Sequence, residues 1–106
     1  MKLLIITAIK AFQKDIKSIL KNARVMTYSY SNVTGYKDIS DQLVESNWFA
    51  SELNETESIL FYAFADNEMV TQVFDLISVF NQQQEALSQI HIAVVDIEKS
   101  NHSNSK

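Results

Sequence analysis

The order in which two hydrophobic periods alternate along the chain limits its fold more than any other feature. Short apolar runs at residues 3–9 and 58–65, rich in β-branched and aromatic side chains, are typical of buried strands. Each run is followed by a segment with the period of an amphipathic helix, and each helix by a further strand-like segment. The expected elements, in chain order, are a strand at 3–9, a helix at 10–23, a strand at 25–33, a strand at 58–65, a helix capped by Asp66 or, alternatively, by Asn67, and a strand at 89–98. The sequence therefore predicts two strand–helix–strand units in succession.

Two such units in one chain are the pattern of the ferredoxin-like βαββαβ sandwich, an α+β fold. Right-handed crossovers place both helices on the same face of an antiparallel four-stranded sheet. The strand that begins each unit becomes central, and the strand that ends each unit lies at an edge. We expect one domain over residues 1–100, with a long loop at about 35–57 and a disordered polar tail at 101–106.

Apolar residues occur on both sides of the predicted strands, although two helices can cover only one side of the sheet. In the first strand the two sides carry Leu3, Ile5 and Ile9, and Leu4, Ile6 and Ala8. The strands at 58–65 and 89–98 alternate in the same way. An apolar patch left open on a monomer usually marks an interface. We therefore expect a closed oligomer in which the sheet faces point inward.

Composition removes several classes of function. The chain has no cysteine, which excludes disulfides, thiol catalysis and cysteine metal sites and suits the cytoplasm, where we expect this protein. A net charge of −4, with acids and bases mixed and no basic stripe standing out, argues against nucleic acid as a partner. No apolar run approaches the roughly 18 residues of a membrane helix, so we expect no insertion into a membrane. The single glycine, Gly35, excludes a phosphate-binding loop built from several glycines.

Several local sequences resemble one family. Lys10-Ala11-Phe12 follow the first strand, the helix after them ends in ILKNA at 19–23, and the second strand runs into VTGYKD at 33–38. With the long loop, the apolar third strand and the last strand running into VDIE at 95–98, this order is similar to that of the PII proteins and their PII-like relatives. The resemblance implies a trimer whose sheets line a central core. It also implies small effectors, often adenine nucleotides, bound between subunits, and a long loop that docks on a transporter, enzyme or regulator.

The chain departs from the PII pattern at the positions that hold phosphates in that family. Gly35 and Tyr36 keep the start of the turn after the second strand, but Lys37 replaces its second glycine. The glycine-rich loop before the last strand is replaced by residues 81–85 (NQQQE), and no arginine follows that strand. The resemblance therefore implies the fold and the trimer, and it does not carry nucleotide binding. No cofactor can be named from the sequence.

Two groups of residues are candidate sites. Gly35, Tyr36 and Lys37 either form a ligand-facing turn, in which Lys37 supplies a charge, or end the strand in an ordinary turn that needs a positive φ. Trp48 and Phe49, in the polar loop, either anchor a protein partner or fold back over the sheet or an adjacent subunit.

Metal-binding and catalytic signals are weak. His91 and His102 lie far apart, and we interpret His91 as a packed or hydrogen-bonded strand residue. The loop acids can attract a cation or simply be solvated; they are Asp38, Asp41, Glu45, Glu52, Glu55 and Glu57. No nucleophile–base set stands out, so we name no catalytic residue and expect no enzyme.

Three functions remain open. The first is a PII-like regulatory protein that senses a small effector at subunit clefts and presents its loop to a partner such as a membrane transporter. The second is a metal-binding trimer of the PII-like or CutA-like kind found in metal tolerance. The third is a small dimeric enzyme of ferredoxin-like fold. Oligomeric state separates the third function from the first two.

Overall fold

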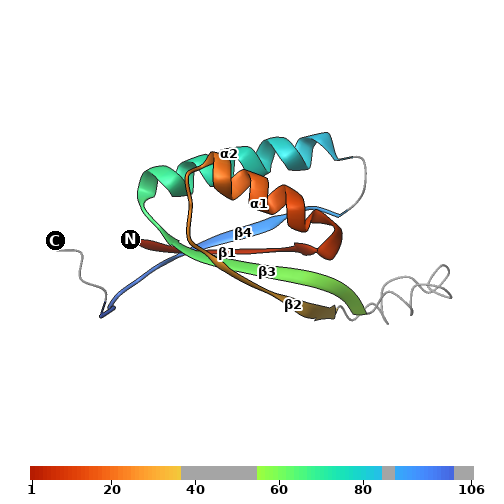
Figure 1. The fold of residues 1–106 in the computed structure, drawn as a ribbon, viewed down its shortest axis with the longest axis horizontal. Helices are drawn as coiled ribbons and strands as arrows, with labels where there is room; N and C mark the ends of the chain where they lie inside the picture. Colours follow the sequence, from red (N-terminus) through yellow and green to blue (C-terminus); the bar gives the residue numbers. More distant parts are fainter. Residues whose placement is uncertain (37–54, 85–87, 102–106) are drawn as a thin grey trace, which may run out of the picture.

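A computed structural model describes residues 1–36, 55–84 and 88–101. It has an α+β fold, with one four-stranded antiparallel sheet and two α-helices (Figure 1). The elements are β1 (Lys2–Ile9), a 3₁₀ turn η1 (Lys10–Phe12), α1 (Gln13–Asn22), β2 (Ser29–Tyr36), β3 (Glu55–Ala65), α2 (Asn67–Gln83) and β4 (His91–Asp96). The predicted order of strands and helices is confirmed. Within the described part of the chain, no helix has the length and apolar character needed to cross a membrane.

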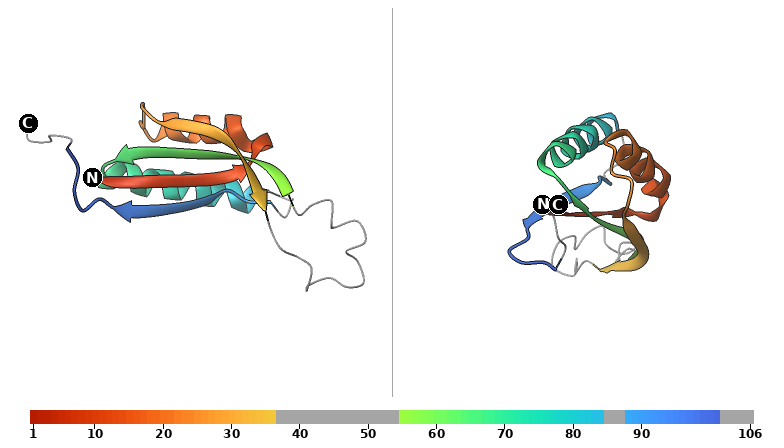
Figure 2. Two further views of the ribbon diagram at one scale, coloured as in Figure 1. Left: turned by 90° about the horizontal axis from the view of Figure 1, so that it is seen from below. Right: turned by 60° about the vertical axis from the view of Figure 1, so that its left-hand side comes forward.

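The strand order in the sheet is β2-β3-β1-β4, so β1 and β3 are central and β2 and β4 are edges, as predicted. All three pairings are antiparallel, and the register aligns Ile6 of β1 with Phe61 of β3 and Ile92 of β4. Both helices lie on one side of the sheet, as the two views of Figure 2 show. The arrangement is compatible with a ferredoxin-like sandwich.

The hydrophobic core fills the space between the sheet and the helices. On the sheet side it contains Leu4, Ile6 and Phe61, which are at most 1% exposed. The helices contribute their inward residues to the same cluster: Ile16, Ile19 and Leu20 from α1, and Val73 and Ile77 from α2. No polar or charged residue of the described part is buried, so hydrophobic burial holds the two layers together.

Local signals set where the helices begin and end. Asp66 caps α2, because its carboxylate accepts a hydrogen bond of 2.9 Å from the Met69 backbone N–H; this confirms the expected cap. At the end of α1, the Arg24 N–H donates to the Lys21 carbonyl and the Val25 N–H to the Leu20 carbonyl. These two bonds form a Schellman motif with Arg24 in the left-handed conformation, at a φ of 66°.

Strand ends differ most from the sequence-based expectation. β2 begins at Ser29 and not at Val25, because Val25 is buried in the core and the chain reaches the sheet edge only after it. β2 then continues through Gly35 and Tyr36, which pair with Thr56 and Glu55. The expected turn at Gly35 is therefore wrong: this glycine lies in a strand and its φ is not positive. The same pairing lengthens β3 at its start.

Arg24 generates a stability prediction. A non-glycine residue in the left-handed region costs about 1 kcal/mol, whereas glycine adopts that region freely. We expect Arg24→Gly to raise the free energy of unfolding by about 0.5 kcal/mol or more, measured by urea denaturation. Arg24→Ala removes the same charge but keeps the Cβ, and it should bring no gain. Equal stabilisation by both variants would assign the effect to charge instead of backbone conformation.

Candidate functional site

The face of the sheet opposite the helices is apolar and uncovered in the described part of the chain. Leu3 and Ile5 of β1 lie beside Phe64 and Tyr62 of β3, and on their other side beside Val95 and Ala93 of β4. We call these six residues the open sheet face. Seen from below in Figure 2, the strands lie in front of both helices. The predicted division of apolar residues between the two faces is confirmed.

Large apolar side chains on the open sheet face meet solvent. Phe64 is 57% exposed, and Tyr62 and Val95 are each 45% exposed. Their cross-strand neighbours Leu3 and Ile5 are half-buried. A contiguous patch drawn from three adjacent strands is larger than the scattered apolar residues normal on a protein surface. This face has the character of a binding surface.

At one end of the same face, the apolar character gives way to polar side chains around a hollow of about 550 Å³. We call it the polar hollow. Its lining comes from all four strands and from Ser88 and Gln89, which precede β4: Thr7, Ala8, Ile9, Val33, Gly35, Tyr36, Thr56, Ser58, Ser88, Gln89 and His91. The strand register creates this site, because it sets Thr7 opposite His91, Val33 opposite Ser58 and Gly35 opposite Thr56.

The polar hollow offers neutral hydrogen-bonding groups. Threonine and serine hydroxyls, the Tyr36 phenol, the Gln89 amide and the His91 imidazole can donate to and accept from a ligand. None of its described lining residues is Lys, Arg, Asp or Glu. Such a site can orient a small polar molecule, whereas the several charges of a nucleotide phosphate call for Arg or Lys partners.

Gly35 keeps the polar hollow open. A Cβ at this position would lie 3.1 Å from the Ser58 hydroxyl oxygen, closer than most real contacts. Any side chain at Gly35 would therefore project into the space beside Ser58, on the open side of the sheet. The glycine acts here through its missing side chain, since its backbone conformation is open to other residues.

The structure brings together two of the three residues predicted to bind a ligand. Gly35 and Tyr36 line the polar hollow, and Tyr36 is 66% exposed. Lys37, Trp48 and Phe49 lie outside the described residues. His91 is a strand residue of β4, as expected, but it is exposed and lines the hollow, so the packed alternative is wrong. Thr7 and Ser58 were missed, although each is a polar residue on the open side of a strand that is otherwise largely apolar.

A metal site has no support in the described part of the chain. No group of three or more His, Asp or Glu residues there is arranged to hold an ion. His91 lines the polar hollow together with hydroxyl and amide groups, and two further carboxylates or imidazoles would be needed to complete a typical site.

The one ion pair among the described residues lies at the opposite end of β4. Lys2 and Asp96 pair across the β1–β4 ladder, and their side chains form a salt bridge. The hydrogen bond from Lys2 and its positive charge lower the pKa of the Asp96 carboxyl. This pair therefore supports the β1–β4 register while Asp96 is ionised, and the support is lost as the pH falls through the lowered pKa.

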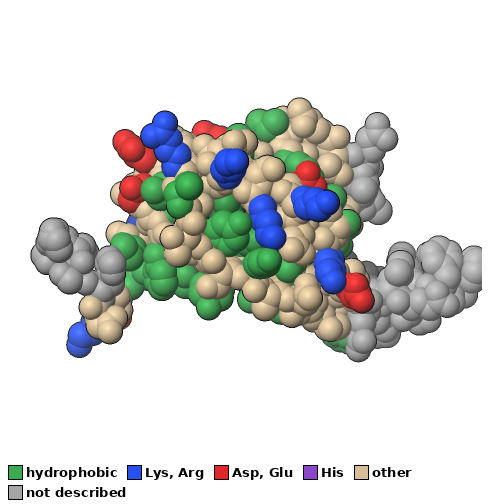
Figure 3. Space-filling model, in the orientation of Figure 1, with side chains coloured by type: hydrophobic (Ala, Val, Ile, Leu, Met, Phe, Trp, Pro, Cys, Tyr) green, Lys and Arg blue, Asp and Glu red, His purple; other side chains and the backbone are tan. Residues whose placement is uncertain are grey.

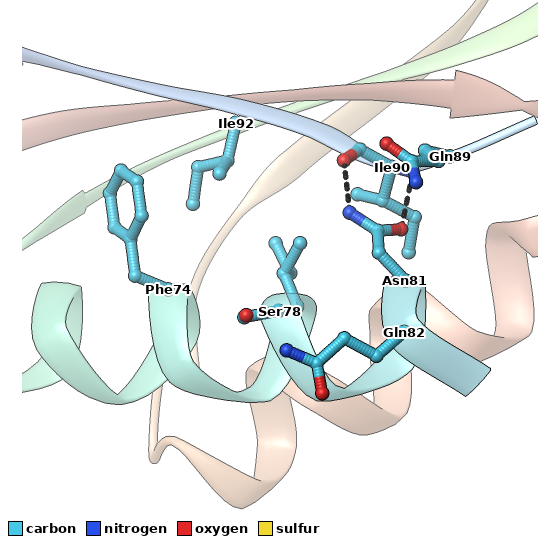
Figure 4. Close-up of a pocket in the computed structure, with 8 residues that line it drawn as sticks. Phe74, Ser78, Asn81, Gln82, Gln89, Ile90 and Ile92 are labelled. Atoms are coloured by element: carbon cyan, nitrogen blue, oxygen red, sulfur yellow. Dashed lines mark hydrogen bonds between the residues drawn. The ribbon is translucent and has the colours of Figure 1, made fainter. Parts of the chain in front are cut away.

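A second hollow, of about 300 Å³, lies between α2 and β4 and has a structural role (Figure 4). The Asn81 side chain donates to the Ile90 carbonyl and accepts from the Ile90 N–H, and each bond has a donor–acceptor distance of 2.9 Å. The side-chain amide of Asn81, which points into the hollow, is therefore already bonded to the backbone on both its nitrogen and its oxygen. The rest of its lining is mixed: Phe74, Ile77, Ile90 and Ile92 are apolar, and Ser78, Gln82 and Gln89 are polar. Asn81 thus fixes the chain as it enters β4.

Comparison with known proteins gives no assignment: no protein-family model matches the chain, and no curated protein does.

Asn81 generates the prediction of this section. Asn81→Ala leaves the part-buried N–H and C=O of Ile90 without partners, which costs about 1–3 kcal/mol. We expect that loss in the free energy of unfolding measured by urea denaturation. Gln82→Ala, at an exposed neighbouring position on α2, should change it by less than about 0.5 kcal/mol. A similar loss in both variants would contradict a specific role for the Asn81 amide.

Proposed function

We propose that this chain is a regulatory binding protein that resembles the PII family, assembles through its open sheet face and holds a small effector in the polar hollow. The observation that carries the proposal is the sheet with helices on one face and Leu3, Ile5, Tyr62, Phe64 and Val95 on the other. The hydrogen-bonding groups of the polar hollow support the second half of the proposal.

The energetics favour association. Each copy that buries a few hundred Å² of this face gains several kcal/mol, at about 25 cal/mol per Å², before the entropy cost of association. We propose three copies with their sheets turned inward, because the resemblance to PII proteins implies a trimer. The polar hollow opens on the same face, so a neighbouring copy would close it and complete a cleft between subunits.

The proposed effector is a small polar molecule with few charges. It would be recognised by hydroxyl groups such as Thr7 and Ser58 and by the His91 imidazole. In this proposal the segment after Tyr36, with Trp48 and Phe49, docks on a protein partner such as a membrane transporter. The protein has no catalytic role in the proposal. Neither the metal-binding alternative nor the dimeric enzyme is favoured by a specific observation.

The assembly is tested by a matched pair of substitutions. Val95 lies on the open sheet face and Val79 on α2, and they are 45% and 50% exposed. Val95→Glu buries a carboxylate in the proposed interface and should break the trimer, whereas Val79→Glu should leave it intact. The measurement is light scattering coupled to size-exclusion chromatography at micromolar concentration. A wild-type monomer would exclude the proposal, and a dimer would favour the small enzyme.

The effector site is tested by thermal denaturation in the presence of nucleotides, bicarbonate and metal ions. A ligand at a hundredfold excess over its Kd stabilises the folded state by about 2.7 kcal/mol, which raises the Tm of a domain this size by several degrees. We expect His91→Ala and Ser58→Ala to reduce that rise. Ser78→Ala, in the hollow between α2 and β4, is the matched control. A rise that survives both substitutions would place the ligand elsewhere.

A further inference from the structure

A row of basic side chains runs along the outer side of η1 and helix α1. Lys10, Lys14, Lys17 and Lys21 follow one another at spacings of four, three and four residues, which places them on one side of a helix. The buried residues of α1 are on the other side, and Arg24 follows the helix end. We call Lys10, Lys14, Lys17, Lys21 and Arg24 the basic row. In Figure 3 several Lys and Arg side chains cross this face of the molecule.

The basic row concentrates positive charge on an acidic protein. The chain has nine Lys and Arg residues, and five of them are in the row, whereas Asp15 is the single acid between Lys10 and Arg24. The net charge of the whole chain is −4. No member of the row is in a salt bridge with another described residue. The expectation that the chain has no basic stripe is therefore wrong for α1.

A hollow with both basic and apolar lining residues adjoins one end of the basic row. It has a volume of about 330 Å³ and is lined by Lys17, Ser18, Lys21, Val25, Met26 and Tyr28. Met26 is 76% exposed, the highest value among the large apolar residues of the described part. Methionine adapts its shape to a partner and is common at binding surfaces. Two interactions with Tyr30 hold Lys17 at the edge of this hollow. The Lys17 Nζ donates a hydrogen bond of 3.1 Å to the Tyr30 hydroxyl and lies 4.5 Å from the centroid of the Tyr30 ring.

We propose that the basic row and this hollow bind an acidic segment of a protein partner. Carboxylates of the segment would pair with Lys14, Lys21 and Arg24, and an apolar side chain would enter the hollow against Met26. The row spans about 20 Å at 1.5 Å per residue, a length that about six residues of an extended peptide would match. The surface lies on the helix layer, so it is independent of the open sheet face.

The observations favour a peptide over an anionic membrane. The apolar residues of α1 point into the core, so the helix cannot insert them into a bilayer. An extended anionic surface acts on the whole chain, whose net charge is −4, and is repelled by it. A short acidic segment contacts only the basic row, within a Debye length of its charges. The hollow is concave, which suits one side chain of a peptide.

Selection from a random peptide library against the full chain tests the proposal. We expect enriched peptides to contain at least two acids and one apolar residue within about six positions. In fluorescence polarisation, Lys14→Glu and Lys21→Glu should each weaken the Kd by about two- to fivefold, and together by about tenfold. Met26→Ala should also weaken it. Lys99→Glu changes the net charge of the chain by the same amount away from the row, and it should leave the Kd unchanged.

Several results would overturn the proposal. Enrichment of no peptide would do so, as would peptides without acids, or an effect of Lys99→Glu equal to that of Lys14→Glu. Sedimentation with phosphatidylcholine vesicles, with and without phosphatidylserine, covers the alternative. Binding to the anionic vesicles that is lost in the Lys14→Glu/Lys21→Glu variant, and that acidic peptides do not compete, would identify a membrane surface instead.

Discussion

A single imbalance underlies this structure: three of the four strands, β1, β3 and β4, carry apolar side chains on both sides of the sheet, and the two helices cover one side. The helices complete a core with Leu4, Ile6 and Phe61, and none of the buried residues in the described part of the chain is polar or charged. The same strands carry Leu3, Ile5 and Phe64 on the other side, because side chains alternate along a strand. A chain of 106 residues buries only a modest share of its surface by itself. The oligomeric state of the folded molecule therefore depends on what covers its second apolar face.

Periodicity alone could predict most of the fold, since it is a local property. Alternation in β1 separates Leu4 and Ile6 from Leu3 and Ile5 without knowledge of any partner strand. Strand ends depend on pairing with distant residues, and a single sequence does not reveal that. Gly35 illustrates the difference: glycine is typical of turns, yet here it continues β2 because Thr56 lies opposite to it.

The candidate sites were harder to predict, because they combine residues that are far apart in the chain. Thr7, Ser58 and His91 are polar residues from three separate strands, and only the register brings them to one hollow. The basic row was missed for another reason. Its spacing is visible in the sequence, but the net charge of −4 averages over the whole chain and conceals a local excess of lysine.

The two layers present surfaces of different chemistry, and this separates two kinds of association. The sheet face is apolar, so contacts on it gain from dehydration and are only weakly affected by salt. The basic row is cationic, so the proposed contacts on it would be specific for charge and screened by salt. Because helix α1 lies on the opposite side of the sheet from Phe64 and Val95, a copy bound at one layer leaves the other accessible. The proposed self-association and the proposed capture of an acidic segment are therefore compatible with each other on one molecule.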